Sequence, residues 1–154
     1  MYRVISSAIL CAAILLVSSA VGWAETDDTP AGAYLLTLNT GTYLGDTLSS
    51  TNDLDWWKVT ITGTGTLTWR VRSLSGGPGL TFVVYQNPGQ TSGSPYVSRL
   101  VAPTDSDRVE WHCAQAGTYY MCVSGLTGQL NNGRYAVRAD FEADPPRSSR
   151  RFPD

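Results

Sequence analysis

Histidine and lysine are almost absent from the sequence, which contains one of each, His112 and Lys58. Histidine is the commonest general base, so a hydrolase would have to assemble its site around His112, with Asp107 and one of the serines. No G-x-S-x-G nucleophile elbow supports that arrangement. One histidine and three cysteines also fall short of the regularly spaced ligands that zinc sites need. We therefore expect a protein that is not an enzyme.

Charge is sparse as well. Only 16% of the 154 residues are charged and the formal net charge is −2, with basic side chains supplied almost entirely by arginine. No run of basic residues forms the stripe that nucleic-acid binding requires, so we exclude a nucleic-acid partner. The length fits a single domain, and 42% hydrophobic residues are enough for a core.

No segment of the mature chain shows a helical period over a helical length. Short apolar–polar alternations recur roughly every ten residues, separated by Gly, Pro, Asn and Asp turns. This spacing predicts an all-β sandwich or barrel of about eight strands. The predicted strands are 44–50, 57–62, 67–72, 80–85, 96–101, 108–113, 118–124 and 134–141.

The N-terminus has the pattern of a secretory signal peptide over residues 1–24. Arg3 precedes an apolar run (8–17) that is too short to span a bilayer, and cleavage is expected after Ala24, or else after Ala20. An uncleaved membrane anchor is the alternative. We expect a secreted or periplasmic protein with no transmembrane segment in the mature chain. It would consist of an acidic arm (25–33), a β-sandwich (34–142) and a disordered Arg/Pro-rich tail (143–154).

Two cysteines, Cys113 and Cys122, remain after signal-peptide cleavage. An exported chain with two cysteines usually pairs them, so we expect a Cys113–Cys122 disulfide. Strand alternation opposes this expectation, because it turns Cys122 outward. A tight hairpin between the two strands would also not place the cysteines opposite each other unless a bulge or a crossing between sheets shifted the register.

Aromatic residues divide by strand parity into two sets. Trp57, Trp69 and Trp111 fall on the inward parity and are predicted to fill the core. A second set falls on the outward parity and would form a platform for stacking on sugars or gripping an extended peptide, if its members emerge on one face. The alternative is scattered surface aromatics. The members of this second set are Trp56, Tyr85 and Tyr120.

Four segments, in order, resemble strand motifs of the bacterial pre-peptidase C-terminal domain: DLDWWKV (53–59), GLTFVVY (79–85), AGTYYMCV (116–123) and GRYAV (133–137). The resemblance extends over about residues 27 to 142 and implies a jelly-roll-like antiparallel β-sandwich. Such domains are usually appended to secreted proteases, where they are thought to aid export or substrate binding. The best-studied relatives bind collagen. With no protease segment in this sequence, we expect a stand-alone copy.

Taken with the predicted export, the resemblance implies a secreted, non-catalytic module that binds extracellular protein or polysaccharide. The alternative is a structural or export-assisting domain that acts with a secreted protease in trans. An exposed, contiguous aromatic patch would favour ligand binding, and its absence would favour the alternative.

Acidic residues dominate the segment 25–55, which holds six of them and no basic residue. Calcium prefers several hard oxygen ligands such as carboxylates. In the collagen-binding relatives, an acidic N-terminal arm and the aspartates before the aromatic strand are implicated in calcium binding. The resemblance thus points to a Ca²⁺ site; the alternative is a solvated arm with turn aspartates. The matching residues are Asp53 and Asp55, with Asp27 and Asp28 from the arm.

Overall fold

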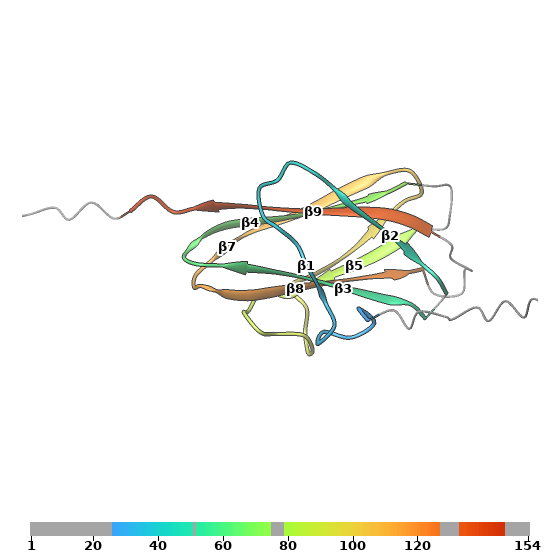
Figure 1. Cartoon of the computed structure of the whole chain (residues 1–154), viewed down its shortest axis with the longest axis horizontal. Helices are drawn as coiled ribbons and strands as arrows, with labels where there is room; N and C mark the ends of the chain where they lie inside the picture. The colour runs from blue at the N-terminus through green and yellow to red at the C-terminus, as the bar shows by residue number, and fades with distance from the viewer. Residues whose placement is uncertain (1–25, 51, 75–78, 127–132, 147–154) are drawn as a thin grey trace, which may run out of the picture.

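The protein consists of two β-sheets packed face to face, as the two layers of ribbon in Figure 1 show. The computed structural model describes residues 26–50, 52–74, 79–126 and 133–146. The predicted signal peptide and residues 147–154 of the predicted tail lie outside these ranges. Within the described residues, no helix is long and apolar enough to cross a membrane.

In the part of the chain that the structure describes, nine strands make up the two sheets. One sheet contains β1 (Tyr34–Leu35), β3 (Leu54–Ile61), β8 (Gly117–Gly125), β5 (Leu80–Val84) and β6 (Val97–Val101), hydrogen-bonded in that order. The other contains β2 (Leu44–Leu48), β9 (Gly133–Ala143), β4 (Gly65–Ser73) and β7 (Ser106–Cys113), in that order. Every pairing except β1 with β3 is antiparallel. The predicted all-β sandwich is confirmed.

The core lies between the sheets and is built by alternation along the strands. On β4, for example, Leu67, Trp69 and Val71 are fully buried, whereas the residues between them point to the outer face. Trp57 and Trp111 are also buried, at 2% and 5% exposure. The inward parity predicted for the three tryptophans is therefore correct.

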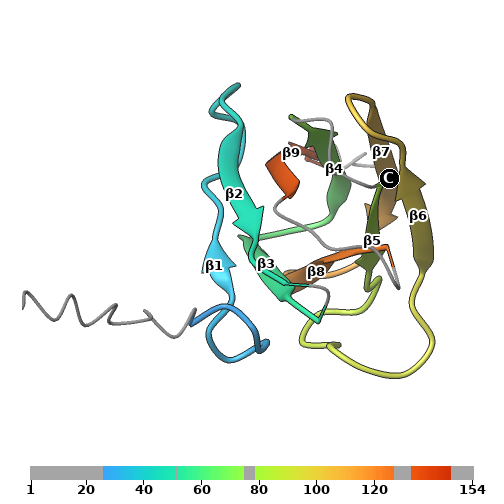
Figure 2. The ribbon, with the colours of Figure 1, turned by 90° about the vertical axis from the view of Figure 1, so that its right-hand side faces the viewer.

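The first strand, β1, was not predicted. Its two residues, Tyr34 and Leu35, are too few to show an alternation, and they pair in parallel with Trp57 and Lys58 of β3. The backbone N–H of Leu36 continues this pairing by donating to the Lys58 carbonyl at 2.9 Å. From β1 the chain crosses to β2 in the other sheet, and Figure 2 shows both strands at the same edge of the sandwich. Residues 34–36 are thereby held against β3.

The structure contradicts the expected disulfide, because Cys113 and Cys122 are both free. Their strands, β7 and β8, belong to different sheets, so residues 114–116 cross between sheets and do not form a hairpin turn. Cys113 faces the core, whereas Cys122 lies on the opposite, outer side of its own sheet and packs with Trp56. The outward parity assigned to Cys122 from the sequence is correct, and it is the reason that the pairing fails.

Candidate metal centre

An N-terminal arm, residues 26–33, folds against the start of β3. The Trp56 backbone N–H donates to the Asp27 carbonyl at 2.9 Å, and the Gly32 N–H donates to the Thr29 carbonyl at 3.0 Å. The loop is so tight that a Cβ at position 32 would overlap the Thr26 carbonyl oxygen, so only glycine fits there. Asp27 and Asp28 are thus carried to the N-terminal end of β3.

Five aspartates meet at this end of the sandwich. Carboxylate oxygens of Asp27, Asp46 and Asp55 lie within 4.8 Å of one another, and so do those of Asp28, Asp53 and Asp55. All four metal-ligand candidates from the sequence are therefore in one cluster, together with Asp46. Sequence reasoning counted Asp46 among the acidic residues but did not select it. Its place between Leu44 and Leu48 on one strand was the signal that it faces inward.

Asp55 is the member common to both groups and is 1% exposed. One of its oxygens, Oδ2, accepts a hydrogen bond from the Tyr135 hydroxyl, which in turn accepts one from Trp57 Nε1 at 3.0 Å. Burial raises the pKa of Asp55 to about 8; the Tyr135 hydrogen bond opposes the shift, and neighbouring aspartates add to it. Tyr135 belongs to the opposite sheet, so these two hydrogen bonds hold the Asp55 carboxylate between the two layers.

Asp27 is 3% exposed, and its Oδ2 is buried without a hydrogen-bond partner among the described residues. Burial is the main cause that raises the pKa of Asp27, and nearby carboxylates raise it further. The pKa values of Asp28 and Asp46 are raised in the same direction, again chiefly by burial. A buried carboxylate oxygen without a partner, such as Asp27 Oδ2, lowers the stability of the fold unless a proton or a cation binds to it.

Backbone groups orient two other members of the cluster. The Ser49 N–H donates to Asp53 Oδ2, and the Thr47 N–H donates to Asp46 Oδ1 at 2.8 Å. Asp46 and Tyr135 line a cavity of about 230 Å³, which Arg134 also lines. The cavity therefore borders the cluster at Asp46.

The donor set fits a hard divalent cation. All five side chains offer carboxylate oxygens, which suit Ca²⁺, Mg²⁺ or Mn²⁺, and the groups contain neither the imidazole nor the thiolate that zinc favours. Two oxygens bound to one Ca²⁺ lie at most about 5 Å apart, which is twice the bond length, and the oxygens in each group satisfy this limit. Asp55, shared by both groups, could serve one ion or bridge two.

The outward aromatic set is gathered on one face, but it is not an open platform. The Trp56 ring stacks on Tyr85 at 5.8 Å and meets Tyr120 edge-on at 6.5 Å. Trp56 is only 7% exposed because Ala33 of the arm belongs to the same buried cluster. The set fastens the arm to the outer face of the five-stranded sheet, and only the two tyrosines remain partly exposed.

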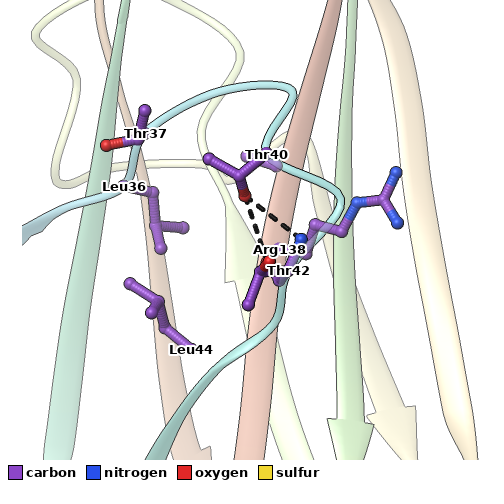
Figure 3. A pocket seen from close by; sticks show the side chains of 7 residues that line it. Leu36, Thr37, Thr40, Thr42, Leu44 and Arg138 are labelled. Atoms are coloured by element: carbon purple, nitrogen blue, oxygen red, sulfur yellow. Dashed lines mark hydrogen bonds between the residues drawn. The ribbon is translucent and has the colours of Figure 1, made fainter.

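A separate cavity of about 210 Å³ lies between the β1–β2 connection and β9. Figure 3 shows Leu36 and Leu44 on one side of it and Thr40 and Thr42 on the other, with the Arg138 guanidinium turned away from the leucines. No carboxylate lines this cavity, so it is unrelated to the metal centre.

The triad imagined from the sequence does not assemble. His112 lies on the outer face of β7 with its Nε2 2.9 Å from Asp144 Oδ2, on an exposed part of the surface. Asp107 lies nearer the start of the same strand, where its Oδ1 accepts the Arg108 N–H.

No protein-family model matches the chain, and no curated protein does. Solved structures do match. The pre-peptidase C-terminal domain of a Bacillus anthracis collagenase is 18% identical, with a TM-score of 0.54, over 70% of this chain and 93% of that one. The Aeromonas hydrophila periplasmic inhibitor of g-type lysozyme is 14% identical, with a TM-score of 0.45, over 70% of this chain and 95% of that one. The chain thus has the β-sandwich fold of a pre-peptidase C-terminal domain, as the four strand motifs led us to expect.

Proposed function

We propose that this protein is a non-catalytic, extracellular binding module whose N-terminal arm is held in place by Ca²⁺. Two observations carry the cation site: Oδ2 of Asp27 is buried and unpartnered among the described residues, and a carboxylate oxygen of Asp27 lies within 4.8 Å of carboxylate oxygens of Asp46 and Asp55. A buried carboxylate oxygen with no hydrogen-bond donor, beside two other carboxylates, is stabilised by a shared cation.

The ion would link three segments that are distant in sequence. Asp27 and Asp28 belong to the arm, Asp46 to β2, and Asp53 and Asp55 to the start of β3. Neutralising their mutual repulsion would close the arm over Trp56 and complete the outer face of the five-stranded sheet. Calcium would therefore act on the structure of the module. The outward aromatic set is packed under the arm and gives no open patch, so it does not support ligand binding. The proposed ligand, an extracellular protein or polysaccharide, would bind another face of the sandwich.

One feature supports a site of action outside the cytoplasm, the signal-peptide pattern of residues 1–24. Carboxylate sites of extracellular modules commonly bind Ca²⁺ at about 10⁻⁴–10⁻³ M, so a site of that kind would be occupied at millimolar calcium.

The test is thermal unfolding of metal-stripped protein with and without millimolar calcium, with magnesium as the second cation. At free calcium 100 times the dissociation constant, the stabilisation would be about 2.7 kcal/mol, and the melting temperature would rise by roughly 6–15 °C. Asp27→Asn and Asp53→Asn should abolish most of this rise. Asp105→Asn is the matched control, because Asp105 is exposed and belongs to neither carboxylate group.

Titration calorimetry completes the test by counting the ions bound to the wild type. One or two calcium ions, lost in the Asp27 and Asp53 variants and retained in the Asp105 variant, would support the site. Wild-type protein whose melting temperature and heat signal do not respond to calcium would overturn it.

A further inference from the structure

Arginine side chains gather on the outer face of the four-stranded sheet. Arg70 of β4 lies directly opposite Arg108 of β7 on one side and Arg138 of β9 on the other. Arg72 occupies the next outward position on β4, and its guanidinium lies 4.5 Å from the centre of the Tyr43 ring. We refer to Arg70, Arg72, Arg108 and Arg138 as the arginine face. Because like charges directly opposite each other on paired strands repel, this row has a cost that an anion would relieve.

Two members of the arginine face are held in fixed positions by one carboxylate. Asp140 accepts from Arg70 Nε at 3.2 Å through one oxygen and from Arg138 Nη2 at 2.9 Å through the other. Arg138 also donates to the Gly41 carbonyl at 3.3 Å. Arg70, Arg138 and Asp140 together keep one net positive charge, and the shared carboxylate holds the two planar guanidinium groups in the fixed orientation that favours binding of carboxylate and sulfate.

A cavity of about 190 Å³ opens beside this row, lined by Tyr43, Arg70, Ser106, Asp107 and Arg108. Its lining combines two guanidinium groups, two hydroxyl groups, an aromatic ring and one carboxylate. Arg108 lines it as an exposed side chain, and Arg72, also exposed, lies over the ring of Tyr43, which lines it too. Sugars with acidic substituents are complementary to this lining, because their isolated negative charges can pair with the guanidinium groups and their hydroxyl groups can bond the remaining polar groups.

We propose that the arginine face binds an anionic polysaccharide, whose carboxylate or sulfate groups bond the guanidinium groups of Arg70, Arg72 and Arg108. The inference gives a ligand class to the binding module proposed above, but it does not depend on the cation site, which involves different residues. Arg72 and Arg108 would supply the contacts that respond most to substitution, because neither is bonded to Asp140.

The spacing of charges on this face favours a glycan over a nucleic acid. Asp107 lines the cavity itself, and Glu110 and Glu142 lie on the same outer face of β7 and β9. A nucleic acid carries a phosphate at every nucleotide and would meet these carboxylates, whereas a polysaccharide can place neutral hydroxyl groups against them. Thr66, on the same face of β4 and partly exposed, adds a further hydroxyl group along its path.

The experiment measures binding of three probes to calcium-saturated, full mature protein by titration calorimetry. The probes are a heparin-derived octasaccharide for sulfate, an oligogalacturonide for carboxylate, and single-stranded DNA of similar charge. We expect at least one oligosaccharide to bind, more tightly than the DNA, and to lose roughly tenfold or more in affinity between about 50 and 200 mM salt.

The Arg72→Gln/Arg108→Gln double variant should bind that oligosaccharide at least about tenfold more weakly. Arg99→Gln is the matched control, because Arg99 is an exposed arginine on β6 of the other sheet, and it should stay within about twofold of wild type. The calcium-induced rise in melting temperature is recorded for each variant and should persist.

Three outcomes would overturn the inference. Binding of neither oligosaccharide would refute it, and so would DNA binding as tight as glycan binding. An equal loss in Arg99→Gln would indicate general charge attraction and would refute it as well. Each of these results, obtained while the calcium response is intact, leaves the proposed cation site standing, so the two proposals fail separately.

Discussion

The hydroxyl of Tyr135 donates a hydrogen bond to Asp55 Oδ2 across the space between the two sheets. The same hydroxyl accepts from Trp57 Nε1 at 3.0 Å, so a buried indole, a phenol and a carboxylate form one chain that ends in the aspartate cluster. The hydrophobic core and the candidate metal centre are therefore connected through hydrogen bonds. A substitution of Tyr135 in the core is therefore expected to change calcium binding at the aspartate cluster.

Replacing Tyr135 with phenylalanine tests this connection. It leaves Trp57 Nε1 without its acceptor and Asp55 Oδ2 without its donor, both in buried positions, so the free energy of unfolding should fall by about 1–3 kcal/mol. The Tyr135 hydrogen bond lowers the pKa of Asp55, so its loss should raise that pKa further. Asp55 would then hold its proton more firmly, and calcium should bind more weakly at neutral pH. Urea unfolding and calcium titration measure the two effects. Tyr96→Phe is the control, since Tyr96 is 45% exposed, and equal losses in both variants would contradict the hydrogen-bond chain.

The stability of the metal-free protein should decrease as the pH rises from about 4 to 8. Burial raises the pKa of Asp55 from 3.8 to about 8, so the folded state holds a proton that the unfolded state has released. The stabilisation is fully present below about pH 4 and is lost as the pH rises through 8, so Asp55 should make the free energy of unfolding decrease over that interval. Urea unfolding in chelator across this range measures the slope.

Two comparisons sharpen the pH experiment. In the metal-free Asp55→Asn variant, the free energy of unfolding should decrease much less between about pH 4 and 8, because the side chain that releases the proton is gone. In saturating calcium the wild-type decrease should disappear or reverse, because metal binding displaces the proton and strengthens with pH. A metal-free wild type that becomes steadily more stable from pH 4 to 8 would show that the buried carboxylate does not hold a proton.

Gly32 sets the position of the arm, and Gly32→Ala should displace it. A methyl group at this position would overlap the Thr26 carbonyl, so the loop that presents Asp27 and Asp28 must open. We expect calcium affinity to fall about tenfold or more, a loss of about 1.4 kcal/mol or greater. In Gly63→Ala, where nothing lies within 4 Å of the added methyl, affinity should be unchanged. Unaltered calcium binding in the Gly32 variant would mean that the arm does not supply ligands.

Both cysteines should be free and unreactive in the folded protein. Cys113 is 1% exposed and Cys122 is 8% exposed, and burial raises the pKa of Cys122 to about 12, which keeps it in the unreactive thiol form. Non-reducing mass spectrometry should find two thiols that iodoacetamide modifies only after denaturation. A mass two units lower, from an internal disulfide, would contradict the placement of these residues in different sheets.

Strand alternation alone determined much of this protein. It gave the class of the fold, the inward set Trp57, Trp69 and Trp111, and the outward direction of Cys122, because a period of two depends only on local backbone geometry. The acidic composition of residues 25–55 was equally visible, and the family resemblance selected four of the five clustered aspartates from it. The two-residue strand β1 was not predicted, because so short a segment shows no alternation.

The tertiary structure decided how elements from distant parts of the chain combine. It placed Asp46 of β2 beside Asp55 of β3, and it buried Trp56 beneath the arm instead of exposing it. It also aligned Arg70, Arg108 and Arg138, which are scattered in sequence, although no basic run predicts a positive surface. Alternation fixes which side of a strand a residue occupies, but strand order and register fix its neighbours, and these depend on the packing of the whole sandwich.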